Sequence, residues 1–282
     1  MPTDSVKGSH EDDASVTVMD ILRQKHPDAR PPKASSLVAC DVLPLLEDVE
    51  ITGSHILFVA HRVQGGAGPG GCDAGHWRDV LLRFGGHSSR LRDAVATLAR
   101  RLLNNIVPWV DIRALIANRL IALDKCPGVR TIGIGETLRR VLGKAVCFAT
   151  RVDVELSCGA DQLCGGVRSG IEGAIHAMTG LFSQHAVSSG WGVLLVDASN
   201  AFNSLNRAAL LWNVRVLWPR CSRFVFNTYQ GWATLVLRGS QEFLYSMEGV
   251  TQGDPLSMFL YAIGTLPLFE ETLLLHTNMV CR

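Results

Sequence analysis

The sequence lacks the features that mark several common classes of protein. Its eight cysteines form no closely spaced C-x-x-C pair, which argues against a zinc ribbon or a disulfide scaffold. No apolar run reaches the roughly 18 residues that a membrane span needs, and the polar N-terminus, "MPTDSVKGSHEDDASV", has no hydrophobic core for a signal peptide. We therefore expect an intracellular protein of the nucleus or cytoplasm that is neither secreted nor embedded in a membrane.

What the chain does contain is the composition of a globular protein: 282 residues, a hydrophobic fraction of 47% and a charged fraction of 19%. Its net charge of +1 conceals an uneven distribution, because residues 76–151 hold 14 Lys and Arg against 5 Asp and Glu, a net charge of +9. So basic a segment indicates either a phosphate-bearing partner or a solvated helical face rich in arginine. Charge alone does not decide between them.

Apolar periodicity predicts an α+β fold in which helices pack on a small antiparallel sheet. Residues 1–55 are expected to form a flexible leader, because large apolar side chains are scarce in its first part. Helices are expected over residues 89–106, 136–154 and 170–185 and from about 205, 224 and 255, and strands over 119–124, 129–134 and 193–196, with a hairpin at 233–246.

Two short stretches place polar side chains beside tight backbone, and each has more than one interpretation. "VLLVDASNAF" is an apolar strand that ends in Asp197, which either caps the next helix or binds a positively charged ligand. In "GVTQGDPLS", Gly253 would let a ligand approach the main chain, and Gln252 offers both a donor and an acceptor. The same stretch is also typical of an ordinary turn before a helix.

In this order the two stretches resemble the palm of a reverse transcriptase, an RNA-directed DNA polymerase. "LDKCPGVRTIGIGETLRRVLGK" is similar to the fingers segment of that family, and "DQLCGGVRSGIEGAIHAM" is similar to the stretch before the palm in non-LTR retrotransposon enzymes. The resemblance covers residues 61–282. It implies a right-hand polymerase with a fingers-like region over residues 56–190 and a partial palm over residues 191–282.

The resemblance also implies a site for two Mg²⁺ ions. Asp197 would be the catalytic carboxylate and a metal ligand, with the backbone carbonyl of Ala198 as a second ligand. Phe202 would pack under the sugar and exclude a 2′-hydroxyl, so that deoxynucleotides are preferred. The implied partners are an RNA template, a DNA primer and deoxynucleotide triphosphates, and no protein partner is indicated.

The remaining residues implied by the resemblance would contact the nucleotide. Lys125 and Arg130 would reach the triphosphate, although both are also typical of solvated charges at a turn. Gln252 and Gly253 would line the nucleotide pocket beside the template base. Together with Ala198 and Phe202, these residues form the nucleotide site that the family resemblance predicts.

The match fails at the family's second acidic motif. A Tyr-x-Asp-Asp turn should follow the Gln-Gly motif, but the sequence ends at Arg282, 30 residues after Gln252, without one, and the thumb is missing too. Thr131 and Met258 also stand where the family usually has proline. We therefore expect a truncated member of an enzyme family that does not polymerise DNA by itself.

An alternative of a different class is a non-catalytic nucleic-acid-binding remnant of a retroelement. In that case residues 76–151 would hold RNA or DNA in a salt-sensitive way, without regard to base sequence. Arg139 and Arg140 are expected to contribute to these contacts, because they open the helix just behind the triphosphate turn.

Overall fold

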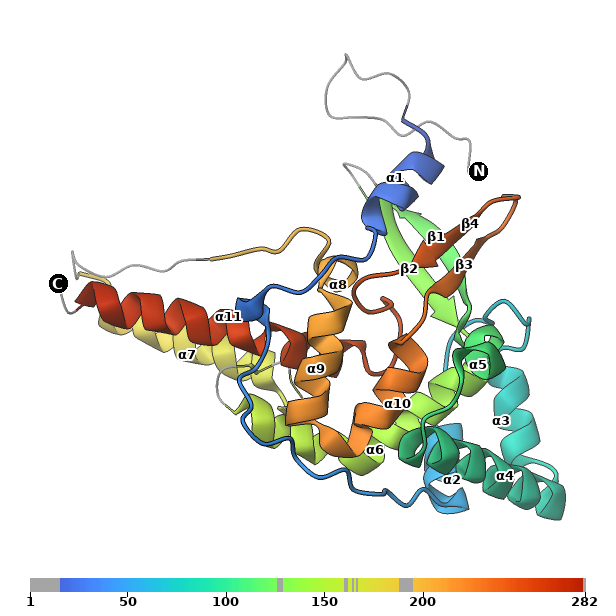
Figure 1. Cartoon of the computed structure of the whole chain (residues 1–282). Helices are drawn as coiled ribbons and strands as arrows, with labels where there is room; N and C mark the ends of the chain where they lie inside the picture. The colour runs from blue at the N-terminus through green and yellow to red at the C-terminus, as the bar shows by residue number, and fades with distance from the viewer. Residues whose placement is uncertain are drawn as a thin grey trace.

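The computed structural model describes residues 16–280 except for 126–128, 160–161, 164, 166 and 188–194, with the side chains of its last helix up to residue 269. Helices with a small sheet make up the molecule (Figure 1), so the expected mixture of α and β structure is confirmed. From the N-terminus the elements are α1 (Val18–Lys25), the short 3₁₀ helix η1 (Ala34–Ser36), α2 (Gly53–Ala60), α3 (Ala74–Leu82), α4 (Gly85–Asn104), α5 (Trp109–Ile116), β1 (Asn118–Asp124), β2 (Val129–Gly135) and α6 (Thr137–Cys158). They continue with α7 (Gly170–Gln184), α8 (Ala201–Ser204), α9 (Arg207–Leu217), α10 (Pro219–Tyr229), β3 (Ala233–Leu237), β4 (Phe243–Ser246) and α11 (Ser257–Val280).

The central helices form where apolar residues recur with helical spacing behind a suitable first residue. Asn206 caps α9, its side-chain oxygen accepting a hydrogen bond from the Ala209 amide at 2.9 Å. Pro219 lies in the first turn of α10, where its missing N–H has no helical partner to lose. With α4, α6 and α11 these helices enclose a large apolar core that includes the fully buried Trp218 and Phe224.

Across the described ranges, no helix has both the length and the apolar character to cross a bilayer.

The sheet is mixed, which corrects the expectation of an antiparallel one. Its strand order is β2-β1-β3-β4, and within each hairpin, β1 with β2 and β3 with β4, the strands run antiparallel. Between the hairpins, β1 and β3 run parallel, with Asn118 opposite Leu235. Each hairpin is local in sequence and has a turn signal, whereas the pairing between them joins distant segments, so no local signal specifies its direction.

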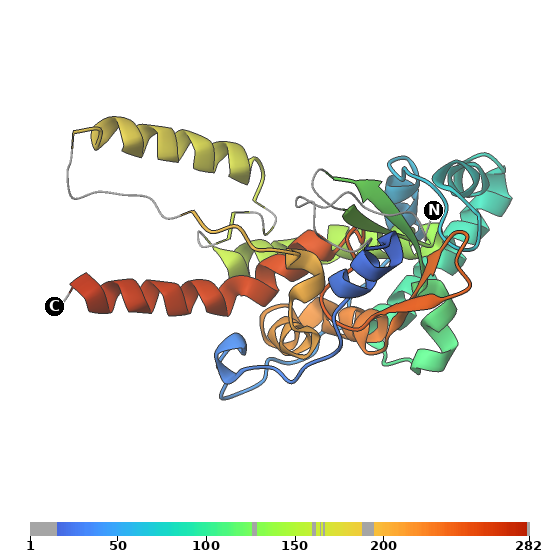
Figure 2. The ribbon, with the colours of Figure 1, turned by 90° about the horizontal axis from the view of Figure 1, so that it is seen from above.

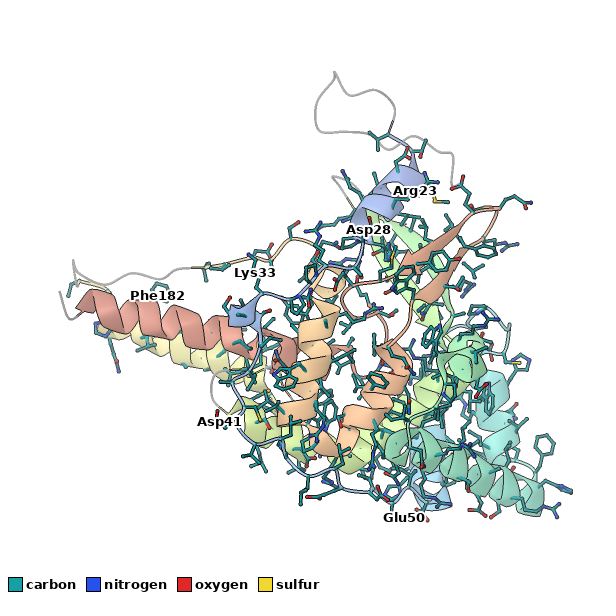
Figure 3. All side chains as sticks on the ribbon, viewed as in Figure 1. Arg23, Asp28, Lys33, Asp41, Glu50 and Phe182 are labelled. Atoms are coloured by element: carbon teal, nitrogen blue, oxygen red, sulfur yellow. The ribbon has the colours of Figure 1, made fainter. Side chains whose placement is uncertain are left out.

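The N-terminal segment from Val16 onward differs from the expected flexible leader. Thr17 and Asp20 form a reciprocal capping box at the start of α1. The helix then packs Met19 and the fully buried Leu22 against the sheet. The following residues 26–52, which we call the N-terminal strap, cross the body of the molecule, as Figure 3 marks with the labelled residues Asp28, Lys33, Asp41 and Glu50.

Side chains of two helices fix the strap by hydrogen bonds to its backbone. The Val38 amide donates to Asn213 Oδ1 at 2.9 Å, and the Trp212 indole donates to the Val38 carbonyl at 2.9 Å. Further along, the amide of Val49 donates to Asn104 Oδ1 at 2.9 Å, and Asn104 Nδ2 donates back to the Val49 carbonyl at 3.0 Å. Because hydrogen bonds to its backbone hold the strap, its sequence needs no regular spacing of apolar residues. The spacing of apolar residues could therefore not predict the path of the strap.

Helix α7 and the stretch at residues 195–196 leave apolar side chains in solvent. Helix α7 and the outer half of α11 extend away from the body, and Figure 2 shows that they lie apart from each other. The strand expected over residues 193–196 falls partly outside the described residues. At Leu195 and Val196, which are 88% and 82% exposed, the expectation of a buried strand is wrong. Such a strand needs neighbours for its hydrogen bonds, and in the described ranges neither hairpin pairs with this stretch.

We predict that Leu22→Ala lowers the free energy of unfolding by about 2–5 kcal/mol, the usual cost of truncating a buried leucine. Leu45→Ala is the control, because Leu45 lies in the strap and is 85% exposed, so its effect should stay within about 0.5 kcal/mol. Urea unfolding followed by circular dichroism measures both variants. A Leu22→Ala variant as stable as the parent would mean that α1 is not docked on the sheet.

Candidate functional site

A cavity of about 150 Å³ lies where the β1–β2 hairpin meets α8 and the loop before α11. Its lining includes four residues that the sequence analysis assigned to a nucleotide site: Lys125, Arg130, Phe202 and Gln252. They come from three separate stretches of the chain, namely the fingers-like hairpin, the stretch after Asp197 and the Gln-Gly stretch. We call this cavity the central pocket.

Main-chain hydrogen bonds hold the Gln-Gly loop, residues 249–254, between α8 and β2. On the α8 side, the Val250 amide donates to the Phe202 carbonyl at 2.7 Å. On the β2 side, the Gly133 amide donates to the Gln252 carbonyl at 3.1 Å. These bonds fix the backbone of Phe202 and Gln252 relative to each other and to β2, so both side chains are positioned at the central pocket.

Two glycines let the Gln-Gly loop approach its neighbours this closely. Gly249 has a φ of +64°, and a Cβ there would collide with the Phe202 carbonyl oxygen. Gly253 has a φ of +113°, and a Cβ there would lie 2.7 Å from the Gly133 carbonyl oxygen. The close packing of the loop against β2 therefore accounts for glycine at position 253. Gly253 is not among the described residues that line the central pocket.

Asp197 and Ala198 lie on an exposed stretch of chain before α8 and are not among the described residues that line the central pocket. The charge of Asp197 nevertheless reaches the pocket's surroundings: burial raises the pKa of Tyr261, and the Asp197 carboxylate raises it further. The Tyr261 ring contacts the Phe202 ring, with centroids 5.0 Å apart. Asp197 thus lies within electrostatic reach of the side chain against which Phe202 packs.

The donor groups near Asp197 bear on the metal site implied by the resemblance. Within the described part of the chain, no three His, Cys, Asp or Glu side chains gather closely enough to hold a metal ion. Asp197 with the Ala198 carbonyl suits a single Mg²⁺ that keeps its waters and arrives with phosphate oxygens. The described residues do not fit a site that would hold two ions by itself.

The residues that line the central pocket and that the sequence did not reveal include Lys25 at the end of α1 and Asn200 at the start of α8. Asn200 has a φ of +53°, a left-handed conformation that asparagine tolerates better than most residues. Its Nδ2 donates to the Lys25 carbonyl at 2.9 Å, and its Oδ1 accepts from Asn203 Nδ2 at 3.1 Å. Asn203 Nδ2 also lies 3.3 Å from Thr131 Oγ1, an acceptor that a proline at this position would lack. The asparagines thus tie α1, α8 and β2 together.

A buried ion pair anchors the Gln-Gly loop to α6. Arg139 contacts the Asp254 carboxylate, and the two side chains are 5% and 2% exposed. Tyr229 Oη donates to the same carboxylate at 2.8 Å. Burial raises the pKa of Tyr229, and the Asp254 charge raises it further, so the phenol stays a hydrogen-bond donor. Burial is the largest single influence on the pKa of Arg139 and would lower it, but Asp254 and Tyr229 together outweigh burial and raise this pKa.

Arg140 is buried as well, against the Gly-rich loop of residues 63–73. Its guanidinium donates to the Gln64 carbonyl at 2.7 Å and to the Gly66 carbonyl. The expectation that Arg139 and Arg140 face nucleic acid is therefore wrong, since they are 4% and 9% exposed. Both arginines neutralise or bond groups inside the protein, and the charge pattern of the sequence could not distinguish this use from a solvated one.

We predict that Arg139→Ala lowers the free energy of unfolding by about 3–5 kcal/mol, because it leaves the Asp254 carboxylate buried without its cation. Arg101→Ala removes the same charge from an exposed position in the last turn of α4 and should cost no more than about 0.5 kcal/mol. Urea unfolding compares the two variants. Equal stabilities would contradict the anchoring role of the Arg139–Asp254 pair.

The resemblance to reverse transcriptases stands on four stretches of sequence, and residues from three of them line the central pocket. The fourth stretch, residues 161–178, includes residues 161, 164 and 166, which lie outside the described part of the chain. The sequence matches no model of a known protein family and no curated protein.

Proposed function

We propose that this chain is the nucleotide-binding part of a reverse transcriptase of the non-LTR retrotransposon type, with its fingers and part of its palm. The observation that carries the proposal is the central pocket, where Lys125, Arg130, Phe202 and Gln252 meet. A ligand site is typically a cavity at which polar groups from different parts of the chain converge. The proposed ligand is a deoxynucleotide triphosphate, bound beside an RNA template and a DNA primer.

The two cations of the β1–β2 hairpin suit a triphosphate. Lys125 and Arg130 are both exposed, so they can reach a ligand without the cost of being buried as charges. Arginine offers a planar fork of donors to phosphate oxygens, whereas lysine offers a compact charge on a flexible stem. The hairpin can therefore bind the charged end of a nucleotide through Lys125 and Arg130.

Phe202 and Gln252 suit the other end of the nucleotide. The Phe202 ring packs against Tyr261, and this contact favours the position in which the ring would meet a sugar that enters the pocket. A ribose would press its 2′-hydroxyl against this ring, whereas a deoxyribose would not. The Gln252 amide has a donor and an acceptor for a base or sugar edge, and its backbone is fixed by the bond to Gly133.

Asp197 is the residue that would hold a metal ion in this proposal, with the Ala198 carbonyl as a second oxygen. When bound, Mg²⁺ supplies positive charge beside the phosphates. The exposed position of Asp197 leaves its carboxylate accessible to an ion that arrives with the nucleotide. Because the sequence contains no Tyr-x-Asp-Asp turn, we propose that these 282 residues bind a nucleotide without adding it to a primer.

Binding of nucleic acid without chemistry is the second candidate function, and the exposed basic residues favour it. A single strand could be held by their charge alone, whatever its base sequence. The cations of residues 76–151 that are exposed and thus open to phosphates are Arg78, Arg83, Arg90, Arg101, Arg113, Lys125, Arg130 and Arg151.

We predict that the chain binds dATP with Mg²⁺ more tightly than ATP with Mg²⁺, and that Phe202→Ala removes this preference. The ratio of the two affinities should fall by about tenfold, or about 1.4 kcal/mol, because the 2′-hydroxyl no longer meets a ring. Phe243→Ala, at a position on β4 that is 61% exposed, should leave the ratio unchanged. Isothermal titration calorimetry measures both affinities. If neither nucleotide binds, the nucleotide site is refuted and the nucleic-acid-binding candidate remains.

We predict that single-stranded RNA binds with an affinity that falls with salt, with a slope in log affinity against log salt of about −0.7 for each phosphate contact. Removing two contacts with the double variant Lys125→Ala/Arg130→Ala should make the slope shallower by about 1.4. Arg238→Ala, exposed and outside residues 76–151, should leave the slope unchanged. Fluorescence anisotropy at several salt concentrations gives the slopes, and an unchanged slope in the double variant would show that the hairpin does not contact the strand.

A further inference from the structure

We propose that the N-terminal segment is part of the nucleotide site: Lys25 is a third cation for the triphosphate, and the docking of α1 is coupled to phosphate binding. The proposal rests on the proposed function, because it assigns one more residue to the same pocket. Lys25 lies outside residues 61–282, the part of the chain that resembles reverse transcriptases. Its role is therefore inferred from the structure alone.

The ionisable residues among the described lining of the central pocket are all positive. Lys25, Lys125 and Arg130 line it together, and none of its described lining residues is acidic. Three like charges around one cavity repel one another, so an anion with several charges relieves this repulsion when it binds. Lys25 is half-buried whereas the other two cations are exposed, so water screens its charge least.

A chain of hydrogen bonds fixes the backbone of Lys25 at the pocket. Asn200 donates to the Lys25 carbonyl at 2.9 Å. Asn200 is held in turn by Asn203, which also bonds to Thr131 on β2. Because Thr131 directly follows Arg130, the same hydrogen bonds set the position of Lys25 relative to a hairpin cation. The lysine is thus a fixed member of the site and not the end of a free arm.

The apolar contact beneath α1 involves the same two strands. Met19 and Leu22 pack with Leu120 of β1 and Val129 of β2, the strands that lead to Lys125 and Arg130. Undocking α1 would therefore take Lys25 out of the pocket. A phosphate chain bound by all three cations would join α1 to the hairpin, and linkage requires that it stabilise the docked helix as much as docking strengthens phosphate binding.

The test compares Lys25→Ala with Lys33→Ala, which removes the same charge from an exposed position in the strap, outside the lining of the central pocket. Calorimetric titration uses inorganic tripolyphosphate and, separately, dATP with Mg²⁺. Both should bind at least about fivefold more weakly to Lys25→Ala, because a charge-assisted contact is lost. Lys33→Ala should stay within about twofold of the parent, and Lys25→Arg, which keeps the charge, should restore most of the affinity.

Hydrogen exchange separates a phosphate contact from a purely structural role. Tripolyphosphate should slow the exchange of α1 amides in the parent and in Lys33→Ala. In Lys25→Ala, α1 should exchange as in the parent without ligand, and tripolyphosphate should no longer slow it. Faster exchange of α1 in the unliganded Lys25→Ala variant would make Lys25 a structural residue and overturn the proposal.

Failure of this inference differs from failure of the proposed function. If Arg130→Ala weakens tripolyphosphate binding and Lys25→Ala does not, the nucleotide site stands and the role of the N-terminal segment is overturned. If the parent binds neither tripolyphosphate nor dATP, both proposals are overturned together.

Discussion

The buried pair of Arg139 and Asp254 is the interaction on which the central pocket depends, because it joins the Gln-Gly loop to the helix that directly follows the β1–β2 hairpin. Arg139 lies in α6, which follows the β1–β2 hairpin, and Asp254 lies at the end of the Gln-Gly loop. With both side chains out of water, their attraction is weakly screened, and Tyr229 satisfies the carboxylate further. The pair holds the loop at β2, where Gly133 bonds to the Gln252 carbonyl.

The basic side chains of residues 76–151 have two different roles. Some of its arginines are structural: Arg139 and Arg140 are buried, and Arg100 donates to the Ile51 carbonyl at 2.8 Å and to Glu50 at 2.7 Å. Others, such as Arg101, Arg113 and Arg130, are exposed and available to phosphates. The net charge of +9 therefore exceeds the charge that the segment can offer to a nucleic acid. This division supports a binding surface centred on Lys125 and Arg130 and not on the start of α6.

The sequence allowed prediction of much that is specified locally or by a motif, although the capping box that starts α1 was missed. Both hairpins carry turn signals, and motif order was enough to associate Lys125 and Arg130 with Phe202, which the structure places in one pocket. The place of Lys25 in the pocket could not be predicted from the sequence. It depends on the hydrogen bond from Asn200 to the Lys25 carbonyl and on the packing of α1 against strands that are distant in sequence. The parallel pairing of β1 with β3 is equally non-local. The expected strand through Val196 depends on neighbouring strands, which a local apolar pattern cannot supply.

The central claim is that one deoxynucleotide triphosphate binds between the β1–β2 hairpin, α8 and the Gln-Gly loop. Photolabelling with 8-azido-dATP, followed by mass spectrometry of the cross-linked peptides, tests it most directly. The account predicts label in peptides that contain Phe202 or Gln252, and loss of that label when excess dATP or tripolyphosphate competes. Label confined to α4 or α7, or label that excess dATP leaves unchanged, would contradict it.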